Sequence, residues 1–315
     1  MRSSLFMPRK LVVVVDEEAR KTLEQNNFRW FSEAKKRNDG EYRLIDPCGN
    51  PIKVRGTLVE EPWLDVHSEE YLYLEITRFC SGDCYTCGPT GIVKGHDPQK
   101  GPTPYIEPIF ALELAEKIRK HTSRLEKRKF FYSGGEPLIE IASFKWIRGF
   151  FDAVENTTFT IATNGLAFPL DMAALTDLVM GLGVDCIMVG YSPGHITDYE
   201  KHAREGTYKG FVPQNVKPEL ALAEKVRILA GYIPDHIGFS VNVVTGDGDA
   251  GIKEWLAKYC SNPRIGFINT MLDKPREPCK QGQELSIRYN GDLHPHCYDV
   301  FTNQHKLGVI GFLVE

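Results

Sequence analysis

The sequence has 315 residues, of which 42% are hydrophobic and 25% charged, a composition that is ordinary for a soluble globular protein. This length suffices for one large α/β domain with an appendage, or for two modest domains. A net charge of -4 without a lysine- and arginine-rich run argues against nucleic-acid binding, and the longest apolar stretches, residues 11–15 and 309–314, are too short to span a bilayer.

The chain contains eight cysteines, and its first residues lack the apolar core of a signal peptide. Cysteines of a protein without an export signal face a reducing compartment, where thiols bind metals instead of forming disulfides. The sequence therefore predicts a cytoplasmic protein that uses some of its cysteines as metal ligands.

Residues 1–66 are predicted to form a small, separate α+β unit. The apolar, β-branched run at 10–15 indicates a strand, and residues 17–26 are charged and compatible with a helix. The runs 42–45 and 52–54 flank a dense turn signal and predict a hairpin. Such a unit would cover the next domain or help to hold a substrate.

A strand is predicted at residues 71–77, where β-forming residues alternate in size. The sequence then continues as Cys80-Ser-Gly-Asp-Cys84-Tyr-Thr-Cys87, so three thiols share one short loop. A structural zinc site uses four ligands, usually as two cysteine pairs, and no second pair follows close by. Three thiolates on a [4Fe–4S] cluster leave one iron free for a ligand from outside the protein. The loop therefore predicts a cluster that acts on a bound molecule.

Strands and helices alternate from about residue 70 to 270, which is typical of a parallel α/β sheet. After 71–77, strands are predicted at 129–132, 159–163, 185–190, 237–244 and 264–269. Helices are predicted from residue 108 and over 144–154, 172–182, 216–230 and 251–259, with a loop after 190. Six strand–helix units fall short of the eight that close a full barrel. The fold class predicted for residues 67–272 is therefore α/β, an incomplete (β/α)6 TIM-like barrel.

Two further motifs follow strands of this series. Ser133-Gly-Gly-Glu-Pro137 follows the strand at 129–132, and Asn164 follows the next one. Paired glycines let the backbone approach a ligand closely, and a glutamate beside them suits a cationic group. A plain strand-to-helix turn would explain Pro137 but not Glu136. Because chemistry in such folds gathers at the carboxyl ends of the strands, we expect these motifs and the cysteines to form one site.

The Cx3Cx2C spacing after a first strand, followed by Gly-Gly-Glu-Pro after the second, resembles the radical S-adenosylmethionine (radical SAM) enzymes. The resemblance implies that Cys80, Cys84 and Cys87 hold a [4Fe–4S] cluster whose open iron binds SAM. It also implies that an electron from the cluster cleaves SAM to a 5′-deoxyadenosyl radical. This radical would abstract a hydrogen atom from the substrate.

The same resemblance implies a set of residues that contact SAM. The Gly-Gly-Glu motif would bind its ammonium group. The aromatic residue that the family usually has directly before the third cysteine stands here one place earlier, as Tyr85. Looser matches are a serine and an arginine after the fourth strand, which could equally belong to a plain loop and a solvated charge, and Asn242 on the fifth. The expected cofactor-binding residues are Tyr85, Gly134, Gly135, Glu136, Asn164, Ser192 and Arg204.

Residues 273–315 are predicted to form a C-terminal β-hairpin cap with its turn at Asn290-Gly291. The segment resembles the start of the SPASM extension, or of its shorter twitch form, which binds auxiliary iron–sulfur clusters in peptide- and sugar-modifying relatives. No cysteine follows Cys297, so Cys260, Cys279 and Cys297 would need a further ligand from elsewhere. We predict a remnant that closes the barrel and one cluster per chain. An auxiliary cluster is the alternative.

Together these features predict a radical SAM enzyme that modifies a ribosomal peptide or another natural product. The alternatives are modification of a sugar, nucleoside or antibiotic, and a non-catalytic metal-binding α/β protein. Many peptide-modifying relatives carry an N-terminal winged-helix module for peptide recognition, which residues 1–66 match poorly. The expected partners are a peptide or small-molecule substrate and an external electron donor that resembles flavodoxin or ferredoxin.

Overall fold

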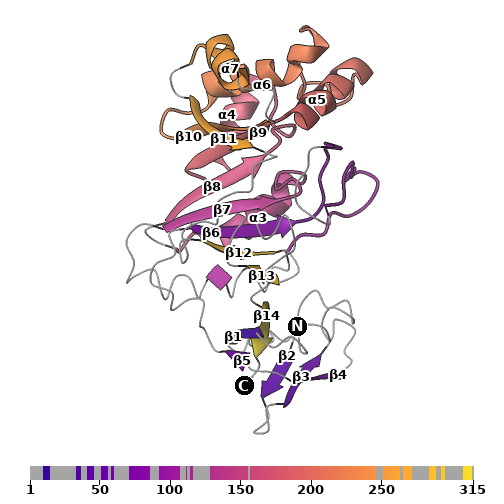
Figure 1. Ribbon diagram of the computed structural model, residues 1–315, viewed down its shortest axis with the longest axis vertical. Coiled ribbons are helices and arrows are strands. Elements are labelled where there is room, and N and C mark those ends of the chain that lie inside the picture. The colour runs from indigo at the N-terminus through magenta and orange to yellow at the C-terminus, as the bar shows by residue number, and fades with distance from the viewer. Residues whose placement is uncertain are drawn as a thin grey trace.

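Six strands that follow one another in the chain also lie side by side in the sheet (Figure 1). Each is rich in β-branched or aromatic residues, and each pairs in parallel with the next. They are β6 (Tyr71–Thr77), β7 (Arg128–Gly134), β8 (Thr157–Thr163), β9 (Cys186–Tyr191), β10 (Gly238–Thr245) and β11 (Ile265–Met271). All six coincide, within a few residues, with the strands predicted from the sequence.

The computed structural model describes part of the chain. The described residues are 10–14, 33–36, 41–45, 51–55, 58–59, 71–85, 92–106, 111, 114–115, 128–154, 157–245, 251–262, 265–271, 284–288, 292–294 and 308–313.

The strands are wound in one direction only, because their order in the sheet is their order in the chain. A doubly wound fold would reverse this order at a switch point, whereas a (β/α) barrel keeps it. Among the described strands, β11 forms one edge of the sheet, so the sheet is open and not closed into a ring. The parallel α/β architecture is thus as predicted, and the curvature of a partial barrel remains a prediction.

Helices connect these strands, as the alternating pattern of the sequence predicts. They are α3 (Ile141–Gly149), α4 (Met172–Met180), α5 (Pro193–Glu205), the short 3-10 helix η1 (Pro218–Leu220), α6 (Ala221–Tyr232) and α7 (Ile252–Cys260). Between β6 and β7, the helical residues Ala111, Leu114 and Ala115 are buried. Helix α3 ends five residues earlier than predicted, and the buried Phe151 and Val154 belong to the turn that follows it.

Helix α5 is the element that the sequence prediction missed, since a loop was expected after residue 190. Ser192 caps the helix by accepting the backbone N–H of His195 at 3.1 Å, and Pro193 occupies the first helical position. Proline is favoured there because its missing N–H would have no partner in the helix. Gly206 ends the helix with a φ of 65°, in the left-handed region. The Ser-Pro-Gly sequence resembles a turn and in fact starts a helix.

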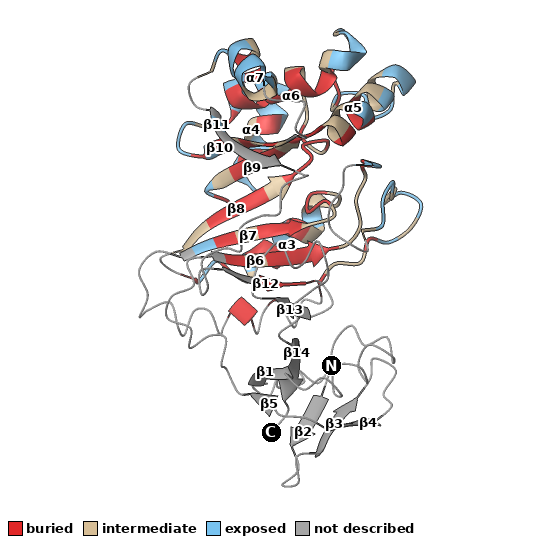
Figure 2. Ribbon diagram, viewed as in Figure 1, coloured by how far each residue is buried: buried red, intermediate tan, exposed pale blue. Residues whose placement is uncertain are grey.

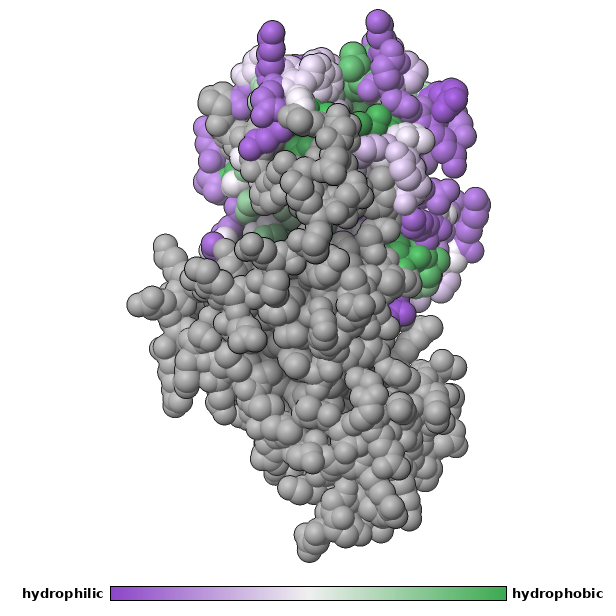
Figure 3. All heavy atoms as spheres, viewed as in Figure 1, coloured by the Kyte–Doolittle hydropathy of each residue, from purple (hydrophilic) through white to green (hydrophobic). Residues whose placement is uncertain are grey.

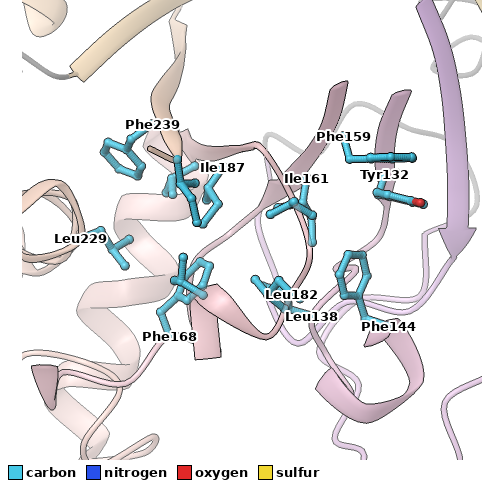
Figure 4. Close-up of a cluster of buried hydrophobic side chains, with 14 of the residues drawn as sticks. Tyr132, Leu138, Phe144, Phe159, Ile161, Phe168, Leu182, Ile187, Leu229 and Phe239 are labelled. Carbon is cyan, nitrogen blue, oxygen red and sulfur yellow. The ribbon is translucent and has the colours of Figure 1, made fainter. Parts of the chain in front are cut away.

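The core lies between the sheet and the helices (Figure 2). Alternation along β6 places Leu72, Leu74 and Ile76 on the helix-facing side, whereas Tyr73 and Glu75 lie on the opposite face. Figure 4 shows how aromatic and aliphatic side chains from strands and helices meet in this layer. The labelled members are Tyr132, Leu138, Phe144, Phe159, Ile161, Phe168, Leu182, Ile187, Leu229 and Phe239.

Strands from both ends of the chain extend the sheet beyond β6. In order they are β12 (Glu284–Ile287), β13 (Asp292–His294), β14 (Gly308–Leu313), β1 (Lys10–Val14) and β5 (Leu58–Val59). β12 runs parallel to β6 and antiparallel to β13, where the sequence predicts the C-terminal hairpin. Because β1 pairs with β14, the two terminal segments share one sheet. The division into units 1–66, 67–272 and 273–315 remains a prediction.

A second sheet holds β2 (Glu33–Lys36), β3 (Glu41–Ile45) and β4 (Pro51–Arg55). β3 and β4 are antiparallel, where the sequence predicts the N-terminal hairpin. The helix predicted at 17–26 lies outside the described residues.

The described surface is mostly hydrophilic in the view of Figure 3. Its larger exposed apolar side chains are spread over several elements, among them Trp146 on α3, Met180 on α4 and Trp255 on α7. None of the helices described here is both long and apolar enough to cross a membrane.

Candidate metal and cofactor site at the strand ends

The cysteine loop, described over residues 80–85, follows β6 directly and is held by a segment that comes later in the chain. The backbone N–H of Cys80 donates to Val93 O at 2.9 Å, and the N–H of His96 donates to Cys80 O at 2.8 Å. The Lys94 ammonium group donates to the carbonyl oxygen of Cys84. These bonds fix the loop at the carboxyl end of β6, as the sequence predicts.

The thiols of Cys80 and Cys84 converge on one spot. A Cβ atom built on the buried Gly82 would lie 3.5 Å from each of the two Sγ atoms, so the sulfurs are at most twice that distance apart. Cys80 Sγ accepts the backbone N–H of Gly82 at 3.3 Å and the side-chain amide of Asn164 at 3.8 Å. Cysteine thiolates that accept N–H bonds are the usual ligands of iron–sulfur clusters, so these residues fit such a group.

The third predicted ligand, Cys87, lies outside the described residues, as do Cys279 and Cys297. Within the described part of the chain, no three His, Cys, Asp or Glu side chains are gathered as a metal site. Cys260 is buried at the end of α7.

The two glycines of the Ser133–Pro137 motif lie against protein backbone. A Cβ on Gly134, whose φ is +150°, would be 2.2 Å from Thr77 O, and one on Gly135 would be 2.3 Å from Phe79 O. The N–H groups of Gly135 and Glu136 donate to these same oxygens at 2.9 and 2.8 Å. The sequence interpretation was that the two glycines let the backbone approach a ligand closely. In the structure the motif packs on the backbone that leads into the cysteine loop, and this contact is enough to require both glycines. A contact of Gly134 and Gly135 with SAM remains a prediction.

Glu136 is buried and joins the ends of β7 and β8. Its carboxylate accepts the Thr163 hydroxyl at 2.6 Å, the Asn164 N–H at 2.6 Å and the Leu138 N–H at 3.0 Å. Burial raises the pKa of Glu136 to about 7, although all three hydrogen bonds lower it. A carboxylate has about four lone-pair sites, so the three protein donors leave one for a further donor.

Asn164 connects four segments around this carboxylate. Its backbone N–H reaches Glu136, and its carbonyl oxygen accepts the Tyr199 hydroxyl of α5 at 2.7 Å. Its side-chain amide donates to Ser81 Oγ at 3.4 Å as well as to Cys80 Sγ. The structure therefore brings together the cysteine loop, Glu136 and Asn164, which the sequence places after three successive strands.

Ser192 is also buried, but its hydroxyl already has partners. It caps α5 and lies 3.1 Å from His195 Nδ1. Burial lowers the pKa of His195 to about 4, so this imidazole is neutral at physiological pH. A contact of Ser192 with SAM remains a prediction.

Contacts of three other expected residues with SAM remain predictions, and the structure gives the place of each. Arg204 is exposed in the last turn of α5, about 18 Å along the helix axis from Ser192. Tyr85 is 69% exposed, on the outer part of the cysteine loop. Asn242 is partly exposed between the buried Val241 and Val243 of β10, so it faces away from the helix layer.

The sequence analysis missed Thr163, Asp198 and Tyr199. Thr163 and Tyr199 bind Glu136 and Asn164, while Asp198 accepts the backbone N–H of Asp83 within the cysteine loop at 3.2 Å. Asp198 and Tyr199 lie on α5, which was expected to be a loop. An Asp four residues before a His, as in Asp198 and His202, is a helical spacing that could have indicated the helix but not its contacts with the site.

No protein-family model matches this sequence, and no curated protein matches it. Among solved structures, histidine-tagged anSMEcpe with bound AdoMet is similar at 12% identity and a TM-score of 0.48, covering 76% of this chain and 77% of that one. Native anSMEcpe with bound AdoMet, and the same protein with AdoMet and Kp18Cys peptide, are each similar at 13% identity and a TM-score of 0.47, with the same coverage. Similarity at this level concerns the path of the chain. The chemistry has to be argued from its own residues.

Proposed function

We propose that this protein is a radical SAM enzyme. The observation that carries the proposal is one hydrogen-bonded cluster at the carboxyl ends of three adjacent parallel strands. It joins the Cys80 thiol after β6 to Asn164 after β8, and Asn164 to Glu136 after β7, with the Cys84 thiol beside Cys80. The agreement of this clustering with the Cx3Cx2C and Gly-Gly-Glu spacing supports the assignment, because barrel-type folds place their chemistry at these strand ends.

In this proposal Cys80, Cys84 and Cys87 hold a [4Fe–4S] cluster. When bound, the cluster supplies the electron that splits SAM into methionine and a 5′-deoxyadenosyl radical able to take a hydrogen atom from substrate. Asn164 orients the Cys80 thiolate through its amide. Glu136 offers its remaining lone-pair site to the SAM ammonium group.

The substrate in the proposal is a peptide or a small natural product, and the electron comes from an external protein that resembles flavodoxin or ferredoxin. The reducing environment of the cytoplasm would keep the thiols available for the cluster. Residues 273–315 would act as a cap without a second cluster.

The cysteine assignment predicts that the Cys80→Ala/Cys84→Ala/Cys87→Ala variant loses the cluster. Wild type reconstituted without oxygen should be brown and bind about four irons per chain, because one cube occupies the three thiolates. The triple variant should bind almost none. Iron analysis and absorption near 400 nm, about where iron–sulfur charge transfer is expected, measure this.

Three other cysteines provide the control for that experiment. Changing Cys260, Cys279 and Cys297 to alanine in the wild-type background should leave the iron content near four. Iron that persists in the first variant and disappears when Cys279 and Cys297 are also changed would show an auxiliary cluster. A colourless wild type that binds zinc would contradict the proposed function itself.

The raised pKa of Glu136 predicts that SAM affinity depends on pH. At pH values below its pKa of about 7, the Glu136 carboxyl group carries a proton, which an incoming ammonium group must displace. Affinity should therefore fall, approaching tenfold per unit, as the pH is lowered below about 7. Calorimetry between pH 5.5 and 7.5 tests this. The Glu136→Gln variant is the control, since it shares every titration of SAM but lacks this carboxyl group. Parallel pH profiles would contradict the role of Glu136.

A further inference from the structure

A buried carboxylate lies directly beneath the cysteine loop. Asp198, on α5, is 5% exposed, and its Oδ1 accepts the backbone N–H of Asp83 at 3.2 Å. Its Oδ2 lies 2.9 Å from the position that a Cβ atom would take on Gly82. The carboxylate therefore contacts two of the three residues that separate Cys80 from Cys84.

The same position on Gly82 is 3.5 Å from both Cys80 Sγ and Cys84 Sγ. The Asp198 carboxylate and the two thiols thus surround one small volume, which only a residue without a side chain leaves free. A hydrogen bond to Asp83 N–H fixes the turn that aims both thiols at this volume. Asp198 contacts the turn, and we do not assign it as a ligand of the cluster.

A second connection runs from the next residue of the helix. Tyr199 donates its hydroxyl to Asn164 O at 2.7 Å, and the Asn164 amide donates to Cys80 Sγ and Ser81 Oγ. Consecutive residues of α5 therefore hold the cysteine loop at two points, one direct and one through Asn164. A helix that merely packed against the sheet would require neither polar contact.

The following turn of α5 lies beside Asp198. His202 Nε2 lies 3.7 Å from Asp198 Oδ1, and His202 Nδ1 lies 2.6 Å from Thr207 Oγ1. The imidazole ring also packs edge-on against Tyr208, with 4.8 Å between the ring centroids. Among the described residues, the hydrogen bond that orients the Asp198 carboxylate is the one from the Asp83 N–H.

We propose that Asp198 is a positioning residue for the cluster, whose carboxylate holds the Asp83 turn so that the Cys80 and Cys84 thiolates converge. This inference rests on the proposed function, because it assigns a role toward the group that the thiolates would hold. It adds a residue from α5 to a site otherwise built from β6, β7 and β8. It also explains why a glycine stands at position 82.

The first test compares how fast an iron chelator removes the cluster from reconstituted variants. Asp198→Ala removes the acceptor of the Asp83 N–H and should release iron at least about tenfold faster than wild type, since hydrogen bonds to a carboxylate are among the stronger ones. Asp198→Asn keeps an oxygen in that place and should stay within about threefold of wild type. Thr197→Ala, on an exposed position of the same helix, should match wild type.

The second test uses the close contact at Gly82. Gly82→Ala would place a methyl group 2.9 Å from Asp198 Oδ2, so this variant should also release iron about tenfold faster. Combining it with Asp198→Ala removes the overlap, so the double variant should release iron no faster than Asp198→Ala alone. Additive effects would show that the two positions act independently and would overturn the proposal.

Spectroscopy separates positioning from simple loss of stability. The electron paramagnetic resonance spectrum of the reduced cluster should change in Asp198→Ala and recover in Asp198→Asn, while thermal melting reports whether each variant folds. If Asp198→Ala fails to fold, release at the wild-type rate from Gly82→Ala overturns the proposal. Equal rates and spectra in wild type and Asp198→Ala also overturn it, and leave the proposed function intact. If the wild-type protein binds no iron, both this proposal and the proposed function are contradicted.

Discussion

Replacing Glu136 with alanine is expected to weaken SAM binding by roughly 10- to 150-fold, the equivalent of a charge-assisted contact of about 1.5–3 kcal/mol. It should also lower the free energy of unfolding by about 3 kcal/mol, because Thr163, Asn164 and Leu138 lose a buried acceptor. The thiol ligands are untouched, so the variant should still take up its cluster. Calorimetric SAM titration, denaturant unfolding and iron analysis measure the three effects.

Glu140→Ala is the matched control for this prediction. Its carboxylate is only four residues further on and also holds protein groups, the Thr103 N–H at 3.3 Å and the Ser143 hydroxyl at 2.9 Å. It does not contact the end of β8, and its loss should leave SAM affinity unchanged. Equal SAM affinity in wild type and Glu136→Ala would contradict the role of Glu136 as the ammonium partner, whatever happens to stability.

The parallel sheet could be predicted because its strands have a strong local signal. Each is a short run of β-branched and aromatic residues bounded by turn residues, and the buried face of β6 follows from simple alternation. Helix α5 lacks such a signal. It is mainly polar, starts with Ser-Pro-Gly and owes its N-terminus to the cap made by the Ser192 hydroxyl. Its start and stop signals, Ser192-Pro193 and Gly206, are local, but Ser-Pro-Gly is equally typical of a turn.

The site could be predicted in outline only. Residue types and spacing indicate which strand ends carry chemistry, and the structure does bring Cys80, Glu136 and Asn164 together. The reason for the glycines was not accessible, because Gly135 is required by the Phe79 carbonyl, 56 positions away in the chain. Asp198 was missed for the same reason, since its partner Asp83 is 115 residues distant. Pairings of this kind exist only in the folded chain.

One long-range pairing joins the C-terminal segment to the strand that precedes the cysteines. Arg288, directly after β12, donates its Nε–H to Glu75 Oε2 at 3.0 Å and a terminal N–H to Oε1 at 3.4 Å. The two side chains are only 3% and 1% exposed. β12 and β6 are neighbouring strands of the sheet. The Arg288–Glu75 pair links them on the sheet face opposite the helices. Because both side chains are buried, solvent cannot take the place of either partner.

Arg288→Ala is therefore expected to lower the free energy of unfolding by about 3–5 kcal/mol, because it removes the Arg288 guanidinium from a carboxylate that is buried. The control is Arg227→Ala on α6, which removes an equally bidentate Arg–Glu pair, with Glu224 at 2.8 and 2.5 Å, whose arginine is 49% exposed. Solvent screens that pair, so its loss should cost less than about 1 kcal/mol.

The double variant Glu75→Leu/Arg288→Met tests whether the cost of Arg288→Ala comes from the buried Glu75 charge that it leaves behind. It removes both charges and keeps apolar volume on the sheet face, so it should recover most of the stability lost in Arg288→Ala. Denaturant unfolding of the three variants and wild type, analysed with a common m-value, measures the differences. If Arg288→Ala were no more harmful than Arg227→Ala, the Glu75 pairing would not be what anchors β12. The position of the C-terminal segment beside the cysteine-bearing strand would then depend on its backbone hydrogen bonds alone.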